Sequence, residues 1–356
     1  MIKAFYKKHV LQFTFNAGTS RGILKQKNSF IIYLVNADNK ITGLGEAGFL
    51  EGLSIEDEDV LETEIIRSIQ DFNFHQTINA DVFTHLPSLR FAWEMCLKDL
   101  AMGGVQHLYD NDFSKGKRGI RINGLIWMSN KAEMILQIRK KIEQGFTCLK
   151  MKIGAIRFDE ELEMIKMIRK EFSENEMQIR VDANGSFSIK EAREKLYKLS
   201  ELRIHSIEQP IAPGQYEWMM NLCESMILPI ALDEELIGIL DESEKYSMLK
   251  MVRPQYIILK PSLLGGWKAS EEWAKAAGSL GIDWWVTSAL ESNIGLNAIA
   301  QWVAEVKPDY IHGLGTGTLY SNNFYSPLFV EKDQLFFDKR IAFNTDQLFT
   351  RYSKSE

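Results

Sequence analysis

The sequence predicts an α/β fold: a (β/α)8-type barrel, in the modified (β/α)7β form, with an N-terminal α+β capping domain. Three observations lead to this prediction. The chain of 356 residues is too long for one average domain. Strand patterns precede helical patterns in the first third, whereas short apolar runs alternate with helical segments after residue 120. Eight such runs are the number that closes a parallel barrel.

The first domain is expected to cover residues 1–115. An alternating, strand-like pattern begins at the N-terminus. Residues 30–35 are apolar and β-rich, and residues 41–48 return after a turn-forming stretch, so the pair predicts an antiparallel hairpin. The last segment, residues 321–356, contains no further strand–helix unit. We expect it to pack back against the first domain and complete it.

Helical spacing follows this hairpin twice. Residues 54–70 have acidic residues near their start, and a second helix is expected from Pro87 to about Met102. Strands followed by helices are typical of an α+β module. The polar stretch at residues 110–119 indicates a linker to the barrel.

The barrel is expected to cover residues 120–320. Segments with helical periodicity separate most of its strands, which predicts a parallel sheet. A doubly wound open sheet is the alternative, but the glycine-rich dinucleotide motif that such folds carry after the first strand is missing here. The eight expected strands are residues 122–125, 147–152, 178–182, 204–208, 228–233, 256–260, 283–288 and 310–313.

Composition excludes several classes of partner. The formal net charge is −6 and the isoelectric point about 5.7, which disfavours nucleic acid as a partner. No signal peptide is visible, and no stretch approaches the ~20 apolar residues that span a membrane. The three cysteines are odd in number and lack metal-ligand spacing, so we expect buried, reduced thiols in a cytoplasmic protein. Association into a homo-oligomer stays open.

Charged and polar residues stand at the ends of successive strands. Catalytic groups of barrel enzymes lie at the carboxyl ends of strands, so these residues should converge on one mouth. A single carboxylate at such a position is as often a helix cap, but three on successive strands favour a shared function. In strand order the residues are Lys150 and Lys152, Asp182 and Asn184, Glu208, Asp233 and Glu234, Lys260, and Ser288 with Glu291 beyond it.

The three carboxylates Asp182, Glu208 and Asp233 predict a site for Mg²⁺, with Mn²⁺ as an alternative, because hard cations prefer oxygen ligands. Lys152 and Lys260 lie on the flanking strands and are expected to face each other across the metal. This set suits the removal of a proton next to a carboxylate, since a divalent cation stabilises the resulting dianion and a lysine accepts the proton. The expected partner is therefore a small carboxylate substrate.

The motifs around these residues resemble the muconate-lactonising subgroup of the enolase superfamily. Lys150 and Lys152, with Met151 between them, match the K-x-K strand end of that subgroup. Cys148 stands where the subgroup often has threonine, a departure that leaves the lysines untouched. Residues 181–184, 207–210, 232–234 and 259–261 match the later strands in order. The resemblance covers residues 120–320 closely, and residues 1–115 are similar to the capping domain.

Within that subgroup the chain resembles the o-succinylbenzoate synthase family. The passages that carry this resemblance are residues 17–22, 122–127 and 312–317, and residues 288–293 resemble the loop that receives the succinyl carboxylate. The resemblance implies that 2-succinyl-6-hydroxy-2,4-cyclohexadiene-1-carboxylate loses water to give o-succinylbenzoate for menaquinone synthesis.

The resemblance also implies a role for each residue. Lys152 is expected to be the base and then the acid for the departing hydroxide, with Lys150 supplying nearby positive charge. Lys260 is expected to stabilise the dianion as a cation, and Glu234 to orient it. Asn184 is expected to support the site or face the substrate. Arg21, in a loop expected to close over the mouth, could meet a substrate carboxylate.

Other functions remain open at this point. An N-succinylamino-acid racemase or a dipeptide epimerase of the same subgroup would use both lysines as bases, and the barrel motifs do not separate these activities. A sugar-acid dehydratase would carry an Asp–His pair where Lys260 and Ser288 stand. A binding scaffold without activity should have lost a lysine or a metal ligand, and none is missing.

Overall fold

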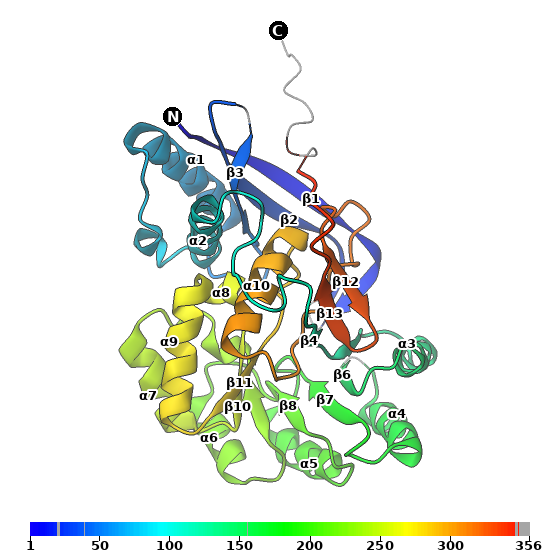
Figure 1. The fold of residues 1–356 in the computed structure, drawn as a ribbon. Helices are drawn as coiled ribbons and strands as arrows, with labels where there is room; N and C mark the ends of the chain where they lie inside the picture. The colour runs from blue at the N-terminus through cyan, green and yellow to red at the C-terminus, as the bar shows by residue number, and fades with distance from the viewer. Residues whose placement is uncertain (20–21, 39, 155, 346–347, 349–356) are drawn as a thin grey trace.

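The computed structural model describes residues 1–356 except 20–21, 39, 155, 346–347 and 349–356. It places an antiparallel sheet with two helices over a barrel of parallel strands, and the last part of the chain returns to lie beside both (Figure 1). The fold is the α/β barrel that the sequence predicts. In the described part of the chain, no helix is both long and apolar enough to cross a membrane.

The N-terminal sheet has the order β1 (Lys3–Thr19), β2 (Gly22–Val35) and β3 (Ile41–Ala47). The predicted hairpin is confirmed, because β2 and β3 pair antiparallel with Phe30 opposite Ala47. The length of β1 and β2 was not predicted. These two strands extend well beyond the part that pairs with β3.

Helices α1 (Glu58–His75) and α2 (Pro87–Ala101), with the short 3₁₀ helix η1 (Ala80–Phe83) between them, cover one face of this sheet. The first helix was expected from residue 54, but it begins later because Asp57 caps it by accepting from the amides of Asp59 and Val60. Gly45 allows β3 to approach α2, since a Cβ there would lie 2.1 Å from the carbonyl oxygen of Ala92.

Seven parallel strands form the barrel sheet, and each hydrogen-bonds to the next in sequence order. They are β5 (Gly124–Ile126), β6 (Cys148–Lys152), β7 (Gln178–Asp182), β8 (Ser206–Glu208), β9 (Ile230–Leu232), β10 (Tyr256–Leu259) and β11 (Asp283–Val286). Helical segments follow the strands: α3 (Lys131–Glu143), α4 (Phe158–Glu171), α5 (Ile189–Ser200), α6 (Tyr216–Glu224), η2 (Glu234–Leu236), α7 (Glu242–Val252), α8 (Pro261–Leu264), α9 (Gly266–Ser279) and α10 (Asn293–Val306).

The predicted eighth strand, residues 310–313, does not form a strand. Instead, His312 makes a single parallel bridge to Ile122, and Gly313 makes one to Thr287. These two bridges join the first and last strands of the sheet and close the barrel. The strand pairing does not extend to residues 310–311. The carbonyl oxygen of Ile311 instead accepts a hydrogen bond from the Arg180 side chain at 3.0 Å.

The C-terminal segment returns to the start of the barrel. Strands β12 (Leu328–Glu331) and β13 (Gln334–Phe337) form a hairpin that pairs with β4 (Ile120–Arg121). Phe324 and Leu348 pack with Ile31 and Tyr33 of the N-terminal sheet. The domain boundaries at residues 1–115 and 120–320, with completion by residues 321–356, stay a prediction.

The closing residue His312 is fully buried. Its Nδ1 accepts from the amide of Val286 at 3.1 Å, and its Nε2 lies 2.9 Å from the carbonyl oxygen of Lys307. Burial, with the charges of Arg180 and Lys307, lowers its pKa from 6.5 to about 3. The imidazole ring of His312 is therefore neutral in the folded protein.

We expect this histidine to make the fold sensitive to acid. A depressed pKa adds stability that is present above the unfolded value and is lost as pH falls from about 6.5 toward 3. At pH 5 the loss should be about 2 kcal/mol. Urea unfolding of wild type and His312→Gln at pH 7 and pH 5 checks this, and the variant should lose less stability over that interval. Equal losses would contradict the assignment.

Candidate active site

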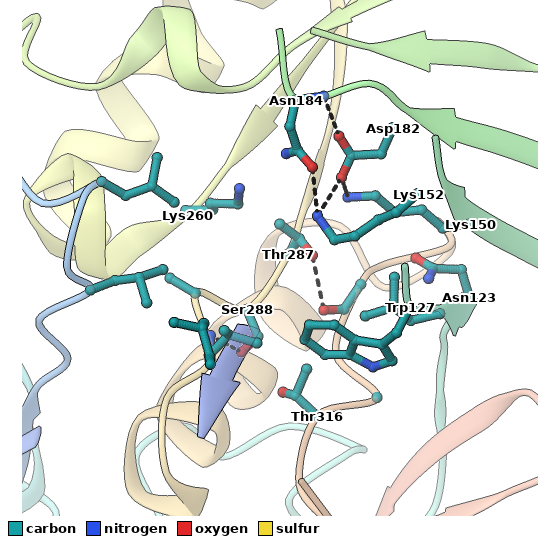
Figure 2. A pocket seen from close by; sticks show the side chains of 18 of the residues that line it. Asn123, Trp127, Lys150, Lys152, Asp182, Asn184, Lys260, Thr287, Ser288 and Thr316 are labelled. Atoms are coloured by element: carbon teal, nitrogen blue, oxygen red, sulfur yellow. Dashed lines mark hydrogen bonds and ion pairs between the residues drawn. The ribbon is translucent and has the colours of Figure 1, made fainter. Parts of the chain in front are cut away.

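A cavity opens at the carboxyl ends of the barrel strands, beneath the N-terminal domain (Figure 2). Strand ends and the loops after them supply most of its lining, and Leu24 of β2 and the segment after β3 supply the rest. The lining residues are Leu24, Leu50, Glu51, Leu53, Asn123, Leu125, Trp127, Lys150, Lys152, Asp182, Asn184, Lys260, Thr287, Ser288, Ala289, Leu290, Gly313, Gly315 and Thr316.

The strand register brings the predicted groups together. Lys152 is the partner of Asp182 across β6 and β7, and Asp182 is the partner of Glu208 across β7 and β8. Lys150 and Lys152 share one face of β6 because side chains alternate along a strand. Strands β9 and β10 continue the same sheet, so Asp233 and Lys260 directly follow their ends.

Lys150 bridges two of the three candidate metal ligands. Its Nζ lies 3.0 Å from Oδ2 of Asp182 and 2.6 Å from Oε2 of Glu208. Burial alone would lower the pKa of Lys150, but these two carboxylates outweigh it and raise the pKa. The ammonium group therefore stays charged. Burial acts against the ionisation of Asp182 as well, yet Lys150 and Lys152 hold its pKa below the usual range.

Lys152 is held at the edge of the cavity by two oxygen atoms. Its Nζ lies 3.1 Å from Oδ2 of Asp182 and donates to Oδ1 of Asn184 at 2.8 Å. Asn184 adopts a left-handed backbone conformation, with φ +44°, and its side-chain nitrogen donates to Oε1 of Glu234 at 2.9 Å. A chain of contacts therefore leads from Glu234 through Asn184 to Lys152.

Lys260 enters from the side opposite Lys152 (Figure 2). It forms a buried ion pair with Asp233. Burial would lower the pKa of Lys260, but Asp233 and Glu234 outweigh burial and raise it. Sequence reasoning expected Glu234 to orient Lys260, and the structure shows that Glu234 also accepts a hydrogen bond from the Asn184 side chain. Lys260 is thus a charged group that faces the cavity.

The acidic residues fit a divalent cation by their chemistry. In the described part of the chain, no group of three His, Cys, Asp or Glu side chains is arranged to hold a metal ion. The ammonium groups of Lys150 and Lys260 contact the carboxylates instead. Burial, with the neighbouring Asp182 and Asp233, raises the pKa of Glu208 well above its usual range, so the charged form of Glu208 lacks full compensation. A dication between these oxygen donors would supply the missing compensation.

Two further predicted residues take different positions. Ser288 lines the cavity, whereas Glu291 is fully buried behind it and accepts from the Ser288 hydroxyl at 2.6 Å. Arg21, the remaining predicted residue, lies outside the described residues.

Sequence reasoning missed the contribution of the segment after β3. Leu50, Glu51 and Leu53 line the cavity, although no motif distinguishes them. Their role depends on how the N-terminal domain lies over the barrel, which local patterns do not encode. Asn123 and Thr316 belong to passages that carried the family resemblance, and that resemblance was the available signal for them.

Comparison with known proteins agrees with this geometry. Residues 133–337 match the family model "Enolase C-terminal domain-like". An o-succinylbenzoate synthase from Desulfotalea psychrophila is 44% identical over 357 residues, which cover 92% of this chain and 96% of that protein. The chain belongs to the o-succinylbenzoate synthase family. This membership places it among enolase-superfamily lyases, as the barrel and its strand-end residues predict.

Solved structures extend the likeness to the whole fold. The crystal structure of MenC from Desulfotalea psychrophila superposes with a TM-score of 0.82 at 39% identity, and covers 94% of this chain and 99% of its own. The L-Ala-D/L-Glu epimerase from Bacillus subtilis superposes with a TM-score of 0.80 at 19% identity, covering 94% and 96%. The epimerase therefore shares the fold, whereas family membership rests on the first comparison.

Proposed function

We propose that this chain is a Mg²⁺-dependent hydro-lyase that converts 2-succinyl-6-hydroxy-2,4-cyclohexadiene-1-carboxylate into o-succinylbenzoate. The observation that carries the proposal is one cavity with Lys152 and Lys260 on opposite sides, each lysine beside a buried carboxylate. Family membership supports the choice of substrate. We also propose that the product serves menaquinone synthesis in the cytoplasm, and the three buried, free cysteines agree with a reducing compartment.

The base in this proposal is Lys152. Its Nζ would take the proton from the carbon next to the substrate carboxylate. Asn184 and Asp182 hold this nitrogen at the cavity edge. The same Nζ would return the proton to the departing hydroxide, so that water leaves and the lysine ends the reaction as it began.

Lys260 would act as a cation. Its raised pKa keeps it protonated opposite the base, where its charge stabilises the enediolate that forms after proton removal. Asp182, Glu208 and Asp233 would hold Mg²⁺, which when bound supplies charge neutralisation at the carboxylate oxygens. Lys150 remains charged and adds to the positive potential around Lys152.

Racemisation is the second candidate activity, since the same two lysines could serve as bases on opposite faces. It would require Lys260 to release its proton in each turnover. The ion pair of Lys260 with Asp233 and the raised pKa of Lys260 oppose this step. The electrostatics therefore favour dehydration, which needs only one proton-transferring lysine.

Purified protein tests the proposal directly. With Mg²⁺, the cyclohexadiene should be consumed and o-succinylbenzoate should appear, as followed by ultraviolet absorbance. An N-succinylamino acid in deuterated buffer, monitored by NMR, measures α-proton exchange as the competing activity. Efficient racemisation without dehydration would overturn the proposal in favour of the second candidate.

Arg21 gives a narrower prediction about substrate selectivity. If its guanidinium meets a substrate carboxylate directly or through water, Arg21→Ala should raise KM or lower kcat/KM by about tenfold, the effect of losing one charged hydrogen bond. The melting temperature should change little. Steady-state kinetics and thermal unfolding measurements check this prediction. Unchanged kinetics would mean that Arg21 does not contribute to substrate binding.

A further inference from the structure

Behind the cavity lies a group of buried polar residues that the reaction described above does not use. It contains two fully buried carboxylates, Glu46 of β3 and Glu291 of the loop before α10. The amino group of Lys27, also buried, has no hydrogen-bond partner within the described residues and lies in the field of both carboxylates. Burying three ionisable groups costs free energy unless hydrogen bonds and opposite charges compensate them.

Glu46 ties the N-terminal domain to the start of α10. One of its oxygens, Oε1, accepts from the Ser29 hydroxyl and from the amide of Ser292 at 2.9 Å. The other, Oε2, accepts from the Ser292 hydroxyl at 2.6 Å and from the amide of Gly295 at 2.9 Å. Ser292 is the N-cap of α10. The carboxylate therefore meets the free amides and the positive end of that helix.

Glu291 ties together two sides of the cavity. It accepts from the hydroxyl of Ser262, two residues beyond Lys260, and from the hydroxyl of Ser288 at 2.6 Å. Ser288 in turn accepts from the amide of Leu290 at 3.0 Å. The only hydroxyl proton of Ser288 is thus directed to Glu291 and away from the cavity.

Residues 288–290, here termed the cavity wall, are consequently held from three sides. Glu291 holds Ser288, the Tyr320 hydroxyl donates to the carbonyl oxygen of Leu290 at 2.7 Å, and Glu46 holds the helix that follows. Leu290 has φ +63°, a conformation that a bulky residue keeps only when its surroundings impose it. All three wall residues line the cavity.

We propose that Glu46 and Glu291 are positioning residues that fix the cavity wall relative to Lys260 and the N-terminal domain. The inference rests on the proposed function, because it assigns the two carboxylates a part in that reaction. Glu46 acts through Ser292 and α10, and Glu291 acts through Ser288 and Ser262. Neither carboxylate lines the cavity.

The first test is kinetic. Glu291→Gln should lower kcat/KM about 10- to 100-fold, the loss expected for one charged hydrogen bond, while Mg²⁺ affinity measured by calorimetry stays unchanged. Because Glu291 acts through the wall, the double variant with Ser288→Ala should be no worse than the poorer single variant. Additive effects, or unchanged kcat/KM in Glu291→Gln, would overturn the inference.

Two glycine variants test the same point without removing a carboxylate. A Cβ at Gly295 would lie 2.8 Å from Cβ of Glu291 and 3.0 Å from Oε2 of Glu46, so Gly295→Ala should displace both groups and lower kcat/KM. Gly278 is the matched control, because it lies in helix α9 and a Cβ there meets nothing within 4 Å. Gly278→Ala should keep wild-type kinetics; equal kinetics in the two variants would contradict the role.

Hydrogen exchange separates this inference from the proposed function. Amides of residues 288–292 should exchange faster in Glu46→Gln and Glu291→Gln than in wild type, and faster than in the buried control Glu56→Gln. If wild type fails to dehydrate the substrate, the proposed function is wrong. If exchange at residues 288–292 is the same in all four proteins, the positioning role is wrong, whatever the activity.

Discussion

Lys152→Ala is expected to stop dehydration, with kcat lower by ~10²–10⁴-fold or more. The reason is that the variant loses the nitrogen that removes the proton and later returns it to hydroxide. Asp182 and Asn184 remain in place, but the amino group that they position is absent from the variant. Steady-state turnover of the cyclohexadiene measures the effect. Near wild-type turnover would show that another group is the base.

Lys260→Ala should reduce kcat to a similar degree by a different route, the loss of a positive charge that faces the enediolate. The two variants can be distinguished by exchange of the substrate α-proton with deuterated solvent. Lys152→Ala should abolish exchange, because proton removal itself is lost. Any residual exchange should appear in Lys260→Ala, where the base is intact.

Metal titration provides the control for both lysine variants. Neither lysine supplies an oxygen ligand, so Mg²⁺ should still bind. Lys260→Ala frees Asp233 from its ion pair and should if anything tighten binding. A loss of Mg²⁺ binding in either variant would mean that the lysine supports the metal site rather than the chemistry.

The part of the site that lies on the barrel could be predicted because the positions of strand ends in the sequence determine where their side chains lie in a parallel barrel. Strand ends lie on one rim, and alternation places Lys150 and Lys152 on one face. The register confirms this relation for Lys152, Asp182 and Glu208. No knowledge of distant contacts was needed, since each residue is placed by its own strand.

Features that depend on contacts between distant segments were not predictable in this way. Leu50 and Leu53 line the cavity only because β3 is docked over the barrel mouth. Glu46 looks like an ordinary strand residue until its contacts with Ser292 and Gly295, some 250 positions away, are known. The prediction of the eighth strand was wrong for a similar reason, because the Arg180 side chain donates a hydrogen bond to the carbonyl oxygen of Ile311.

The metal variants complete the set of expected results. Asp182→Asn, Glu208→Gln and Asp233→Asn should each weaken Mg²⁺ binding and abolish turnover, because each replaces an anionic oxygen donor by a neutral amide. The loss of affinity should be at least the roughly 10- to 100-fold that mutation of a ligand's supporting partner costs. Calorimetric titration with Mg²⁺ measures it, independently of activity.

The matched control is Glu56→Gln, a buried carboxylate of the N-terminal domain whose oxygen accepts from the amide of Ser88 at 3.1 Å. It should bind Mg²⁺ as wild type does. Circular dichroism should show that all four variants are folded, since their replacements are close in volume. Protein treated with EDTA should be inactive and should recover on addition of Mg²⁺. Full activity without any divalent ion would refute the metal site, because the lysines alone would then compensate these carboxylates.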